Sequence, residues 1–370
     1  MKVGIFTSPV DDNMTAGQST YIRGLCKQLL KLVKDDEEIY FLHHTRTDDE
    51  LYRQGNEIIV PRQALRRELF LRSTDLDIIH YQSVKTLSTP FCILNGKINV
   101  TTVHDASGLE YPLNTTLKHY VALKYLWPII LRAFTKIITV SNDSSKRLQK
   151  WFKLRPGRVV AIYNGVDPMF QILSESGSRA RLASKYGVRS RFILHVNKFM
   201  PRKNPRVLID AFASLRQKNG NYKLVIIGKG WENELVEGLL DRHNLQDHVQ
   251  RLGWIPYEDV PLFFNVADVY LYPSLYEGFG LSIIEAMACG CPVVSSNVAA
   301  IPEIAGDAAL LAKDPTNSDE FADLLIQSLE NDLLREEMIT KGVQRAKLFS
   351  WRTNAEETLA MYRELSSKRI

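Results

Sequence analysis

Two glutamates separated by seven residues, Glu277 and Glu285, lie in a stretch whose residue types suit a phosphorylated sugar. The residues between them are Gly278, Phe279, Gly280 and the beginning of an apolar run, 281–288, with helical spacing. We expect the chain to turn at the glycines and to enter a helix near Leu281. The first N–H groups of a helix are unpaired and partly positive, so they suit phosphate. Carboxylates beside them can accept hydrogen bonds from hydroxyl groups, which favours a sugar nucleotide. Taken alone, the pattern also fits a solvated loop.

A second group of chemically suitable residues follows the apolar run 192–196. Lys198, Arg202 and Lys203 place three cations within six residues, at the end of an expected strand and before an expected helix. Cations at such a position suit a diphosphate that must be neutralised as it leaves. The alternative interpretation is a solvated basic turn.

Short apolar runs alternate with amphipathic segments along the chain, and these elements must position the residues above. The expected strands are 2–7, 39–42, 58–60, 78–81, 100–103, 137–140, 159–163, 192–196, 223–228, 249–252, 269–271 and 292–295. The expected helices are 16–32, 62–71, 115–134, 143–152, 205–218, 232–243, 257–264, 281–288, 318–331, 333–347 and 353–365. The polar segment 171–178 is expected to be a linker. Strands that alternate with helices predict parallel sheets covered on both faces, hence two doubly wound α/β domains with ligands at the carboxyl ends of the strands.

Length and composition agree with a two-domain globular protein. The 370 residues exceed the size of an ordinary single core, and 45% hydrophobic with 24% charged residues is an average balance. The N-terminal apolar run is too short for a signal peptide, and no stretch reaches the ~18 apolar residues of a membrane span. The four cysteines, Cys26, Cys92, Cys289 and Cys291, lack zinc-binding spacing, so we expect buried, reduced thiols in a cytoplasmic protein.

The net charge is unevenly distributed. Residues 1–170 contain 23 Lys and Arg against 17 Asp and Glu, a net charge of +6, whereas the rest of the chain has a net charge of −1. One basic segment contains Arg62, Arg66, Arg67 and Arg72, interleaved with Leu65, Leu69, Phe70 and Leu71. At helical spacing this segment suits an anionic bilayer surface. The alternative is a solvated face over a core stripe, and nucleic acid is disfavoured because leucines rather than aromatics separate the arginines.

The string SLYEGFGLSIIEAMACGCPVVSSN, from Ser274 to Asn297, resembles the Glu-x7-Glu signature of retaining GT-B glycosyltransferases of family 4. The resemblance extends over nearly the whole chain. It implies a GT-B fold of two Rossmann-like, doubly wound parallel-sheet domains with a cleft between them. Residues 1–170 would form the acceptor-binding domain and 188–350 the nucleotide-sugar-binding domain. The helix in 351–370 would cross back to the first domain.

The resemblance also implies roles for residues of the second domain. Glu277 would hold hydroxyls of the donor sugar, Glu285 the ribose hydroxyls, and Lys203 the phosphates. Lys198 stands where the family usually has arginine, which keeps the charge but loses the two-pronged geometry. The remaining implied donor contacts are Gly278, Phe279, Gly280 and Leu281 for the phosphates and Gly253, Trp254 and Ile255 for the base. Core packing is an equally good interpretation of Trp254.

In the first domain, Gly17 matches a glycine-containing loop (14–21) that approaches the donor phosphate in the family. Many relatives have paired glycines where this chain has Ala16 before Gly17, and a helix-start turn explains the glycine about as well. His104 and Asp105 end an expected strand. The resemblance places His104 near the donor sugar and Asp105 near the acceptor, although a structural hydrogen bond is the ordinary role of such a histidine. Ser141 is expected to cap the next helix, and the turn 164–167 to shape the hinge.

The resulting prediction is a retaining hexosyltransferase with Glu277, His104 and Lys203 as its catalytic residues. GDP-mannose is the favoured donor and a lipid-linked or polysaccharide glycan the acceptor, at the cytoplasmic face of a membrane. No metal or other cofactor is expected, because Asp11-Asp12 and Asp48-Asp49 lack the context of a metal-binding motif. One alternative is a transferase that uses UDP-glucose, UDP-galactose or UDP-GlcNAc on a soluble acceptor. Another is a non-catalytic Rossmann protein that binds nucleotide or nucleic acid. An oxidoreductase is disfavoured, since Gly4 and Gly17 do not supply G-x-G-x-x-G after the first strand.

Overall fold

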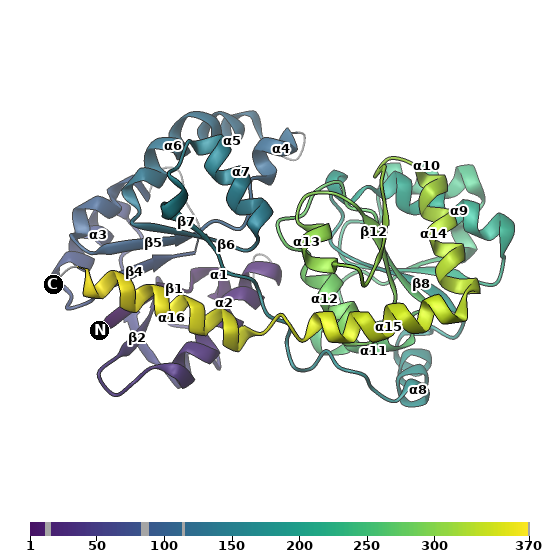
Figure 1. Ribbon diagram of the computed structural model, residues 1–370, viewed down its shortest axis with the longest axis horizontal. Helices are drawn as coiled ribbons and strands as arrows, with labels where there is room; N and C mark the ends of the chain where they lie inside the picture. The colour runs from purple at the N-terminus through teal and green to yellow at the C-terminus, as the bar shows by residue number, and fades with distance from the viewer. Residues whose placement is uncertain (12–15, 83–88, 113–114, 369–370) are drawn as a thin grey trace. The chain divides into compact units, whose positions relative to one another are not determined.

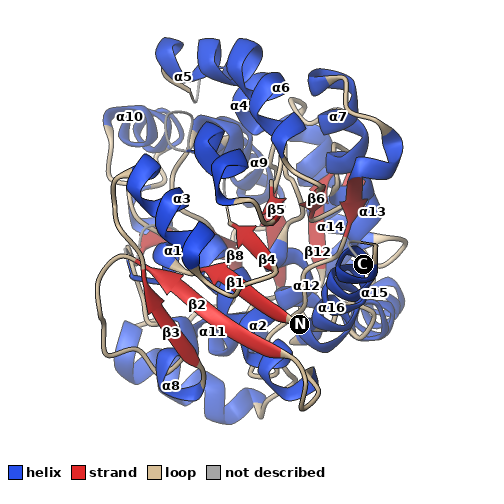
Figure 2. Cartoon of the chain, turned by 90° about the vertical axis from the view of Figure 1, so that its left-hand side faces the viewer, coloured by secondary structure: helices blue, strands red, loops and turns tan. Residues whose placement is uncertain are grey.

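Two parallel β-sheets, each covered by helices on both faces, make up the chain (Figures 1 and 2). The computed structural model describes residues 1–11, 16–82, 89–112 and 115–368. Contacts group residues 1–165 and 350–370 into an N-terminal unit, and residues 166–349 into a C-terminal unit. The last helix therefore belongs to the N-terminal unit. Among the described residues, no helix combines the length and the hydropathy that crossing a bilayer requires.

The sheet of the N-terminal unit has seven strands in the order β3-β2-β1-β4-β5-β6-β7. Its strands are β1 (Lys2–Phe6), β2 (Glu38–His43), β3 (Asn56–Ile59), β4 (Ile78–Tyr81), β5 (Ile98–Thr102), β6 (Lys136–Thr139) and β7 (Val159–Ala161). Its helices are α1 (Ser8–Asp11), α2 (Ala16–Leu32), α3 (Ala64–Ser73), α4 (Ser107–Glu110), α5 (Leu117–Val121), α6 (Trp127–Ile130), α7 (Asn142–Phe152) and α16 (Trp351–Ser367). Helices α3, α5, α6 and α7 lie on one side of this sheet, and α2 and α16 on the other (Figure 1). The seven strands expected here from the sequence are confirmed, with ends that differ by at most two residues.

The single helix expected over 115–134 is wrong. The segment begins as α5, widens into a π-helical turn at Ala122–Leu126, continues as α6 and ends in a 3₁₀ turn at Leu131–Ala133. Pro128 explains the interruption, because it has no N–H to donate to the carbonyl of Lys124 and its ring crowds that carbonyl. A wider turn before the proline absorbs the mismatch.

The sheet of the C-terminal unit has six strands in the order β10-β9-β8-β11-β12-β13. Its strands are β8 (Phe192–Val196), β9 (Lys223–Ile227), β10 (Val249–Arg251), β11 (Val269–Tyr272), β12 (Val293–Ser296) and β13 (Leu310–Ala312). Its helices are α8 (Glu175–Tyr186), α9 (Pro205–Lys218), α10 (Glu234–His243), α11 (Val260–Val266), α12 (Leu281–Ala288), α13 (Ile301–Ala305), α14 (Ser318–Glu330) and α15 (Asp332–Ala346). The chain order reverses between β8 and β11, which makes this pair of strands the switch point of the sheet.

The expected linker over 171–178 is also wrong in its second half. Helix α8 begins at Glu175, and the Ser174 hydroxyl accepts a hydrogen bond from the Gly177 N–H (3.4 Å). Serine before a helix satisfies N–H groups that the first turn leaves unpaired, so a Ser-rich stretch can start a helix as well as form a linker. The sequence prediction also missed α13 and β13, which are too short to show a period.

Residues of β11 show why the C-terminal sheet is buried on both sides. Tyr270 and Tyr272 pack into the core on one face, and Val269 and Leu271 into the core on the other. Successive side chains of a strand point to opposite faces, so a strand buried on both faces has an unbroken apolar sequence. The burial of β11 fixes where its carboxyl end lies, and hence where the following loop begins.

Helix α16 is held to the N-terminal unit by polar contacts as well as by packing. The Tyr362 hydroxyl lies 2.5 Å from His80 Nδ1 on β4, and Arg363 makes a two-pronged ion pair with Glu37 (2.6 and 2.7 Å). Gly24 of α2 lies directly under the Trp351 ring, where an added Cβ would come within 2.3 Å of a ring carbon. The absence of a side chain at Gly24 therefore lets α16 approach α2.

We predict that Gly24→Ala lowers the free energy of unfolding by about 1–3 kcal/mol, because the methyl group forces α16 away from α2. Gly17→Ala in the same helix is the matched control, since nothing lies within 4 Å of a Cβ there. The control should be neutral or stabilising by up to about 1 kcal/mol. Urea denaturation measures both values, and an equal effect of the two substitutions would contradict this packing.

Candidate functional site

Glu277 and Lys203, two of the predicted donor-binding residues, come together at the switch point of the C-terminal sheet. Strands β8 and β11 are hydrogen-bonded neighbours, with Ile193 beside Val269. The loops that follow them, 197–204 and 273–280, therefore leave the same edge of the sheet side by side. The Leu275 N–H donates to the Arg202 carbonyl (2.8 Å), which joins the two loops. In open α/β sheets this position is where ligands bind.

The carboxylate of Glu277 is the centre of a buried cluster. Its Oε1 accepts hydrogen bonds from Lys203 Nζ (2.6 Å), Arg202 Nη1 (2.9 Å) and the Ser274 hydroxyl. Lys203 Nζ also donates to the Tyr272 hydroxyl (3.0 Å), and Arg202 Nη1 to the Tyr276 carbonyl (2.8 Å). Glu277 and Lys203 are both buried. The structure thus unites Glu277 with Lys203, as two residues of one site.

The electrostatics of this cluster decide what Glu277 can do. Burial alone would raise its pKa, but the charges of Lys203 and Arg202 outweigh burial and lower the pKa to about 2. Two cations around one carboxylate leave the cluster with a net charge of +1. Glu277 therefore stays ionised at neutral pH and accepts hydrogen bonds. A group with so low a pKa is a poor general base.

Sequence reasoning noted Arg202 as one of three cations but did not select it as a site residue. The structure gives it as direct a contact with Glu277 as Lys203 has. Lys198, which was selected, is exposed, and no hydrogen bond or ion pair among the described contacts joins it to Glu277. The sequence offered one signal for Arg202, which is that it directly precedes the selected Lys203. The structure places both residues on the 3₁₀ turn Pro201–Lys203.

Helix α12 begins at Leu281, as expected, and its first turn is entered through Gly280. Gly280 has φ = +96° and provides no side-chain cap. Residues with a Cβ are disfavoured in this left-handed region, and a Cβ here would also come within 3.1 Å of Ile283. Phe279 is buried, with its ring edge-on to that of Phe349 (5.6 Å). The glycine thus brings the start of a helix to the loop that contains Glu277.

Glu285, the second glutamate of the signature, has the opposite environment. It is buried in α12 and accepts a hydrogen bond from the Tyr257 hydroxyl (2.6 Å). Burial raises its pKa to about 7, the Tyr257 hydrogen bond opposes that shift, and the charge of Asp167 adds to it. Glu285 is therefore near half-ionised at neutral pH. Tyr257 was not predicted as a site residue.

The loop expected to contact the base follows β10. Trp254 is 68% exposed, whereas its neighbour Ile255 is buried in the core. The core-packing interpretation of Trp254 is therefore wrong, and Ile255 takes that place. The Gly253 carbonyl accepts a hydrogen bond from the Gly228 N–H (2.7 Å).

His104 follows β5 in the N-terminal unit. Its ring lies edge-on to the Tyr21 ring at 5.1 Å, and its Nε2 is buried with no hydrogen-bond partner among the described residues. Burial lowers its pKa, against a smaller opposite effect of Asp105, so the imidazole is neutral at neutral pH. Buried ring nitrogens without a partner are uncommon, which makes Nε2 available to a ligand hydroxyl.

Other predicted residues of the N-terminal unit have local roles. Asp105 Oδ1 accepts a hydrogen bond from the Ser107 N–H (2.8 Å) at the start of α4. Gly17 is exposed in the first turn of α2, while residues 14–15 of its expected loop lie outside the described residues. Ser141 caps α7 by accepting from the Ser144 N–H (3.1 Å), as predicted.

The acidic pairs and the cysteines were considered as metal ligands in the sequence. Among the described residues, no group of three or more His, Cys, Asp or Glu side chains is placed to hold a metal ion. Asp48 pairs with Arg53 and Asp49 with Arg23, while Asp12 lies outside the described residues. The four cysteines are buried free thiols.

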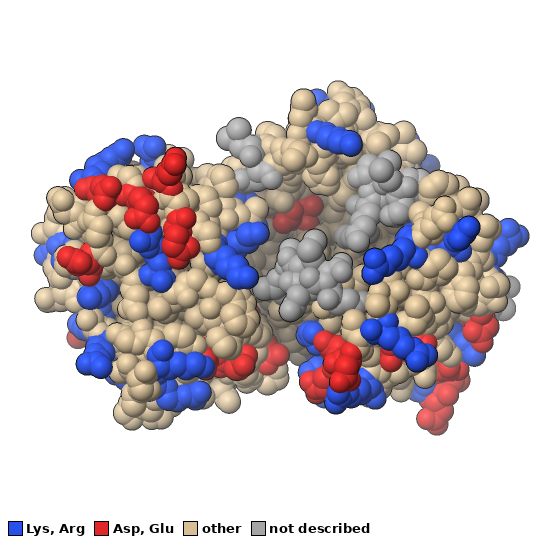
Figure 3. Space-filling model, turned by 180° about the vertical axis from the view of Figure 1, so that it is seen from behind, with Lys and Arg blue, Asp and Glu red and all other residues tan. Residues whose placement is uncertain are grey.

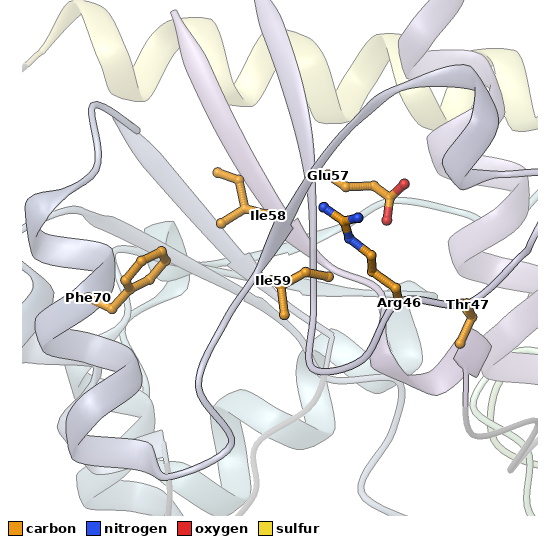
Figure 4. Close-up of a pocket in the computed structure, with 6 residues that line it drawn as sticks. All are labelled: Arg46, Thr47, Glu57, Ile58, Ile59 and Phe70. Atoms are coloured by element: carbon orange, nitrogen blue, oxygen red, sulfur yellow. The ribbon is translucent and has the colours of Figure 1, made fainter.

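A cavity of about 460 Å³ lies at the carboxyl ends of β2 and β3 in the N-terminal unit (Figure 4). It is lined by Arg46, Thr47, Glu57, Ile58, Ile59 and Phe70. None of the residues predicted from the sequence to bind the donor or the acceptor lines it. The cavity is therefore separate from the Glu277 cluster.

Comparison with solved structures shows the fold. The chain aligns over its whole length with a sucrose-phosphate synthase from Thermosynechococcus elongatus, which is also fully covered (TM-score 0.78, 21% identity). It aligns over 98% of its length with the Anabaena protein HepE in complex with UDP and glucose, of which 100% is covered (TM-score 0.76, 18% identity). Two Rossmann-like parallel-sheet domains that align with these structures give the chain the GT-B fold.

Comparison with known sequences shows the family. Residues 180–345 match the model for glycosyl transferases group 1, and residues 15–170 match glycosyltransferase family 4. The O-antigen chain mannosyltransferase B of Escherichia coli is 33% identical over 268 residues, which are 72% of this chain and 70% of the relative. The chain belongs to the group 1 glycosyltransferases of family 4 and is a hexosyltransferase. The alternative of a non-catalytic nucleotide-binding protein is thereby disfavoured.

The raised pKa of Glu285 predicts a stability that depends on pH. A carboxyl group with a pKa of about 7 when folded and about 4.3 when unfolded stabilises the fold at low pH. That stability is lost as the pH rises from about 4.3 to above about 7, by about 3.7 kcal/mol in total. Glu285→Gln cannot ionise, so its free energy of unfolding relative to wild type should increase by about that amount between about pH 4 and pH 8.

Denaturation of both proteins at the two pH values measures the difference. Glu258→Gln is the matched control, since Glu258 is an exposed glutamate next to Tyr257. If Glu285→Gln and the control show the same pH dependence, Glu285 is not the buried titrating group.

Proposed function

We propose that this protein transfers a hexose from a nucleotide diphosphate sugar to a glycan hydroxyl, with retention of the anomeric configuration. The observation that supports this most is the buried cluster of Glu277, Lys203 and Arg202 at the switch point of the C-terminal sheet. Its net positive charge and the start of α12 together suit a diphosphate, and its ionised carboxylate suits sugar hydroxyls. The C-terminal unit would bind the donor and the N-terminal unit the acceptor.

Each residue has one role in this proposal. The diphosphate is neutralised by Lys203, Lys198 and the N–H groups at 278–281. Lys203 acts through its charge at a distance, because its ammonium group is already hydrogen-bonded to Glu277. Glu277 accepts hydrogen bonds from the donor sugar, and Glu285 from the ribose hydroxyls. The 253–255 loop contacts the base. His104 is neutral, and its Nε2, which has no hydrogen-bond partner among the described residues, accepts a hydrogen bond from a sugar hydroxyl. Gly17 and Asp105 remain proposed contacts of the donor phosphate and the acceptor.

The chemical step needs no base from the protein. The bond between the anomeric carbon and the diphosphate oxygen breaks, and the acceptor oxygen bonds to the same carbon from the same face. The acceptor proton moves to the departing diphosphate. A Glu277 that stays ionised fits this step, because its charge stabilises the positive charge that develops on the sugar. Positive charge from Lys203, Lys198 and Arg202 would replace a divalent cation.

Mannose is the favoured sugar and GDP-mannose the favoured donor. The support is the 33% identity to a relative named as an O-antigen chain mannosyltransferase. UDP-glucose is the second candidate, because a structural neighbour was solved with UDP and glucose.

The donor is tested by thermal shift and by transfer assays with GDP-mannose, UDP-glucose, UDP-galactose and UDP-GlcNAc. A donor present at 100 times its Kd stabilises the folded state by about 2.7 kcal/mol. GDP-mannose should produce the largest shift, and donor turnover should persist in excess chelator. A larger shift with a UDP-sugar would overturn the donor assignment, and loss of activity with rescue by magnesium or manganese would overturn the metal-free mechanism.

Glu277→Gln should lower kcat more than tenfold, because the variant loses a charge that acts on the sugar in the transition state. The affinity for free nucleotide diphosphate should stay equal or rise, since the cluster changes from a net charge of +1 to +2. Calorimetry and initial rates separate the two effects. Ser274→Ala is the control, as it removes a hydrogen bond from Glu277 without changing the charge. Equal losses of nucleotide affinity and of kcat would contradict the proposed role.

We propose a lipid-linked acceptor reached at the cytoplasmic face of a membrane. The N-terminal unit has 27 Lys and Arg against 19 Asp and Glu, and the C-terminal unit 20 against 23. Arg66 and Arg72 on α3, and Arg62 just before it, are exposed and suit an anionic surface. Arg67 does not, because it is buried beside Glu68 (2.7 Å), which corrects its expected membrane role. Four buried thiols agree with a reducing compartment.

Charge alone does not define a membrane surface on this protein. Figure 3 shows basic and acidic side chains interspersed on the face turned to the viewer, without one large basic field. On this face the positive charge is not concentrated in one place, so a membrane contact there would need a more local feature.

A further inference from the structure

The segment from α5 to α6 exposes large apolar side chains to a degree that is unusual for a folded surface. Leu117 is 78% exposed, Ile129 67% and Tyr125 60%. Val121 and Leu126 are also exposed. Single exposed apolar residues are ordinary, but a contiguous group of them marks a binding surface. We refer to Leu117, Val121, Tyr125, Leu126 and Ile129 as the apolar stripe.

The geometry of the segment explains why these side chains lie on one side. Leu117, Val121, Tyr125 and Ile129 follow one another at intervals of four residues, which places them along one face of a helical segment. Leu123, Ile130 and Leu131 take the opposite face and pack into the core of the N-terminal unit. The residues of this segment that pack into the core are therefore different from those of the stripe, which face solvent.

The charged residues of the segment that contains the stripe are all basic. The sequence from 111 to 142 contains Lys118, Lys124, Arg132 and Lys136 and no Asp or Glu. Lys124 Nζ lies near the rings of Tyr120 (5.8 Å) and Tyr125 (5.6 Å), so this ammonium group is beside the exposed aromatic ring. Apolar and aromatic side chains interleaved with lysines are complementary to the interface of an anionic bilayer.

A neighbouring region of the same unit has a similar character. Helix α3 exposes Leu65, Leu69 and Phe70 together with its basic residues, and it lies on the same side of the sheet as α5 and α6 (Figures 1 and 2). Between them, the 3₁₀ turn Thr89–Asn95 packs on α3 and exposes Ile93. The stripe is thus the most exposed part of a broader apolar side of the N-terminal unit.

We propose that the apolar stripe inserts into the interface of an anionic bilayer and holds the N-terminal unit at the membrane surface. Lys118 and Lys124 would lie at the level of the lipid headgroups, while Leu117, Tyr125 and Ile129 enter the acyl boundary. The inference rests on the proposed function, because it supplies the means by which an acceptor in the membrane is reached. It names a partner, an anionic lipid surface, and a contact made by apolar insertion as well as by charge.

A single environment-sensitive fluorophore at the stripe tests insertion directly. All four native cysteines are buried, so a cysteine introduced at Leu117 or Ile129 can be labelled selectively. Leu333→Cys in the C-terminal unit is the matched control, because Leu333 is 81% exposed and lies on α15. With phosphatidylcholine–phosphatidylglycerol vesicles, the labels at 117 and 129 should shift to the blue and brighten, and the label at 333 should not. No change at 117 and 129, or an equal change at 333, would overturn the proposal.

A vesicle co-sedimentation experiment separates this inference from the proposed function. Leu117→Ser/Tyr125→Ser/Ile129→Ser should bind anionic vesicles at least about tenfold more weakly than wild type, and the Leu333→Ser/Leu348→Ser control should bind like wild type. Each protein should bind less to neutral phosphatidylcholine vesicles than to anionic vesicles, because charge contributes to the contact. Undiminished pelleting of the triple variant with anionic vesicles would overturn insertion. Binding of the stripe to an acidic protein but not to anionic vesicles would also overturn the proposal, because the partner would then not be a lipid surface.

Both variants should retain the affinity of wild type for the nucleotide diphosphate, which is measured without vesicles. If the triple variant pellets normally while wild type transfers sugar, the membrane inference is wrong and the proposed function stands. If wild type inserts but turns over none of the nucleotide sugars, the proposed function is wrong and the membrane contact stands.

Discussion

The ionised carboxylate of Glu277 must be compensated, because a buried charge without partners is strongly unfavourable. Its compensation comes from Lys203 and Arg202, which are more than seventy positions away in the sequence. The carboxylate and the cations can meet only if β8 and β11 are neighbours and their loops leave the same edge. The ion pair therefore depends on the strand order of the C-terminal sheet. If β8 and β11 were not neighbours, the cluster around Glu277 would not form.

The two glutamates of the signature show how one residue type acquires two chemical characters. Glu277 has two cations within hydrogen-bond distance, which lower its pKa to about 2. Glu285, in a similarly buried position, has only a hydroxyl donor among its described hydrogen-bond partners, and burial raises its pKa to about 7. The difference is in the surroundings, since the side chains are identical. A permanently charged group suits charge stabilisation, whereas a group that titrates near neutrality would couple the binding of any ligand that it contacts to its own protonation.

The N-terminal unit shows where patterns of residue type mislead. Arg67 lies in a run of arginines that resembles a solvated basic face, yet it is buried with Glu68, which also accepts hydrogen bonds from Tyr81 (2.6 Å) and Asn95 (2.9 Å). The segment 117–130 is mainly apolar, yet Leu117, Tyr125 and Ile129 are exposed. Amphipathic spacing shows that two faces differ, but it does not show which face meets solvent.

Sequence by itself determined most of the strands and helices and the glycine entry into α12, and it singled out Glu277, Lys203 and Glu285 as candidate site residues. These features depend on neighbouring residues in the sequence, namely the spacing of apolar residues, the conformational freedom of glycine and the sequence motif. Tertiary structure alone decided that Arg202 shares the carboxylate of Glu277, that Tyr257 bonds Glu285, and that Trp254 is exposed. It also decided the burial of Arg67 and the exposure of the apolar stripe. Burial and pKa depend on groups brought together from distant parts of the chain, so they become defined only when the sheets form.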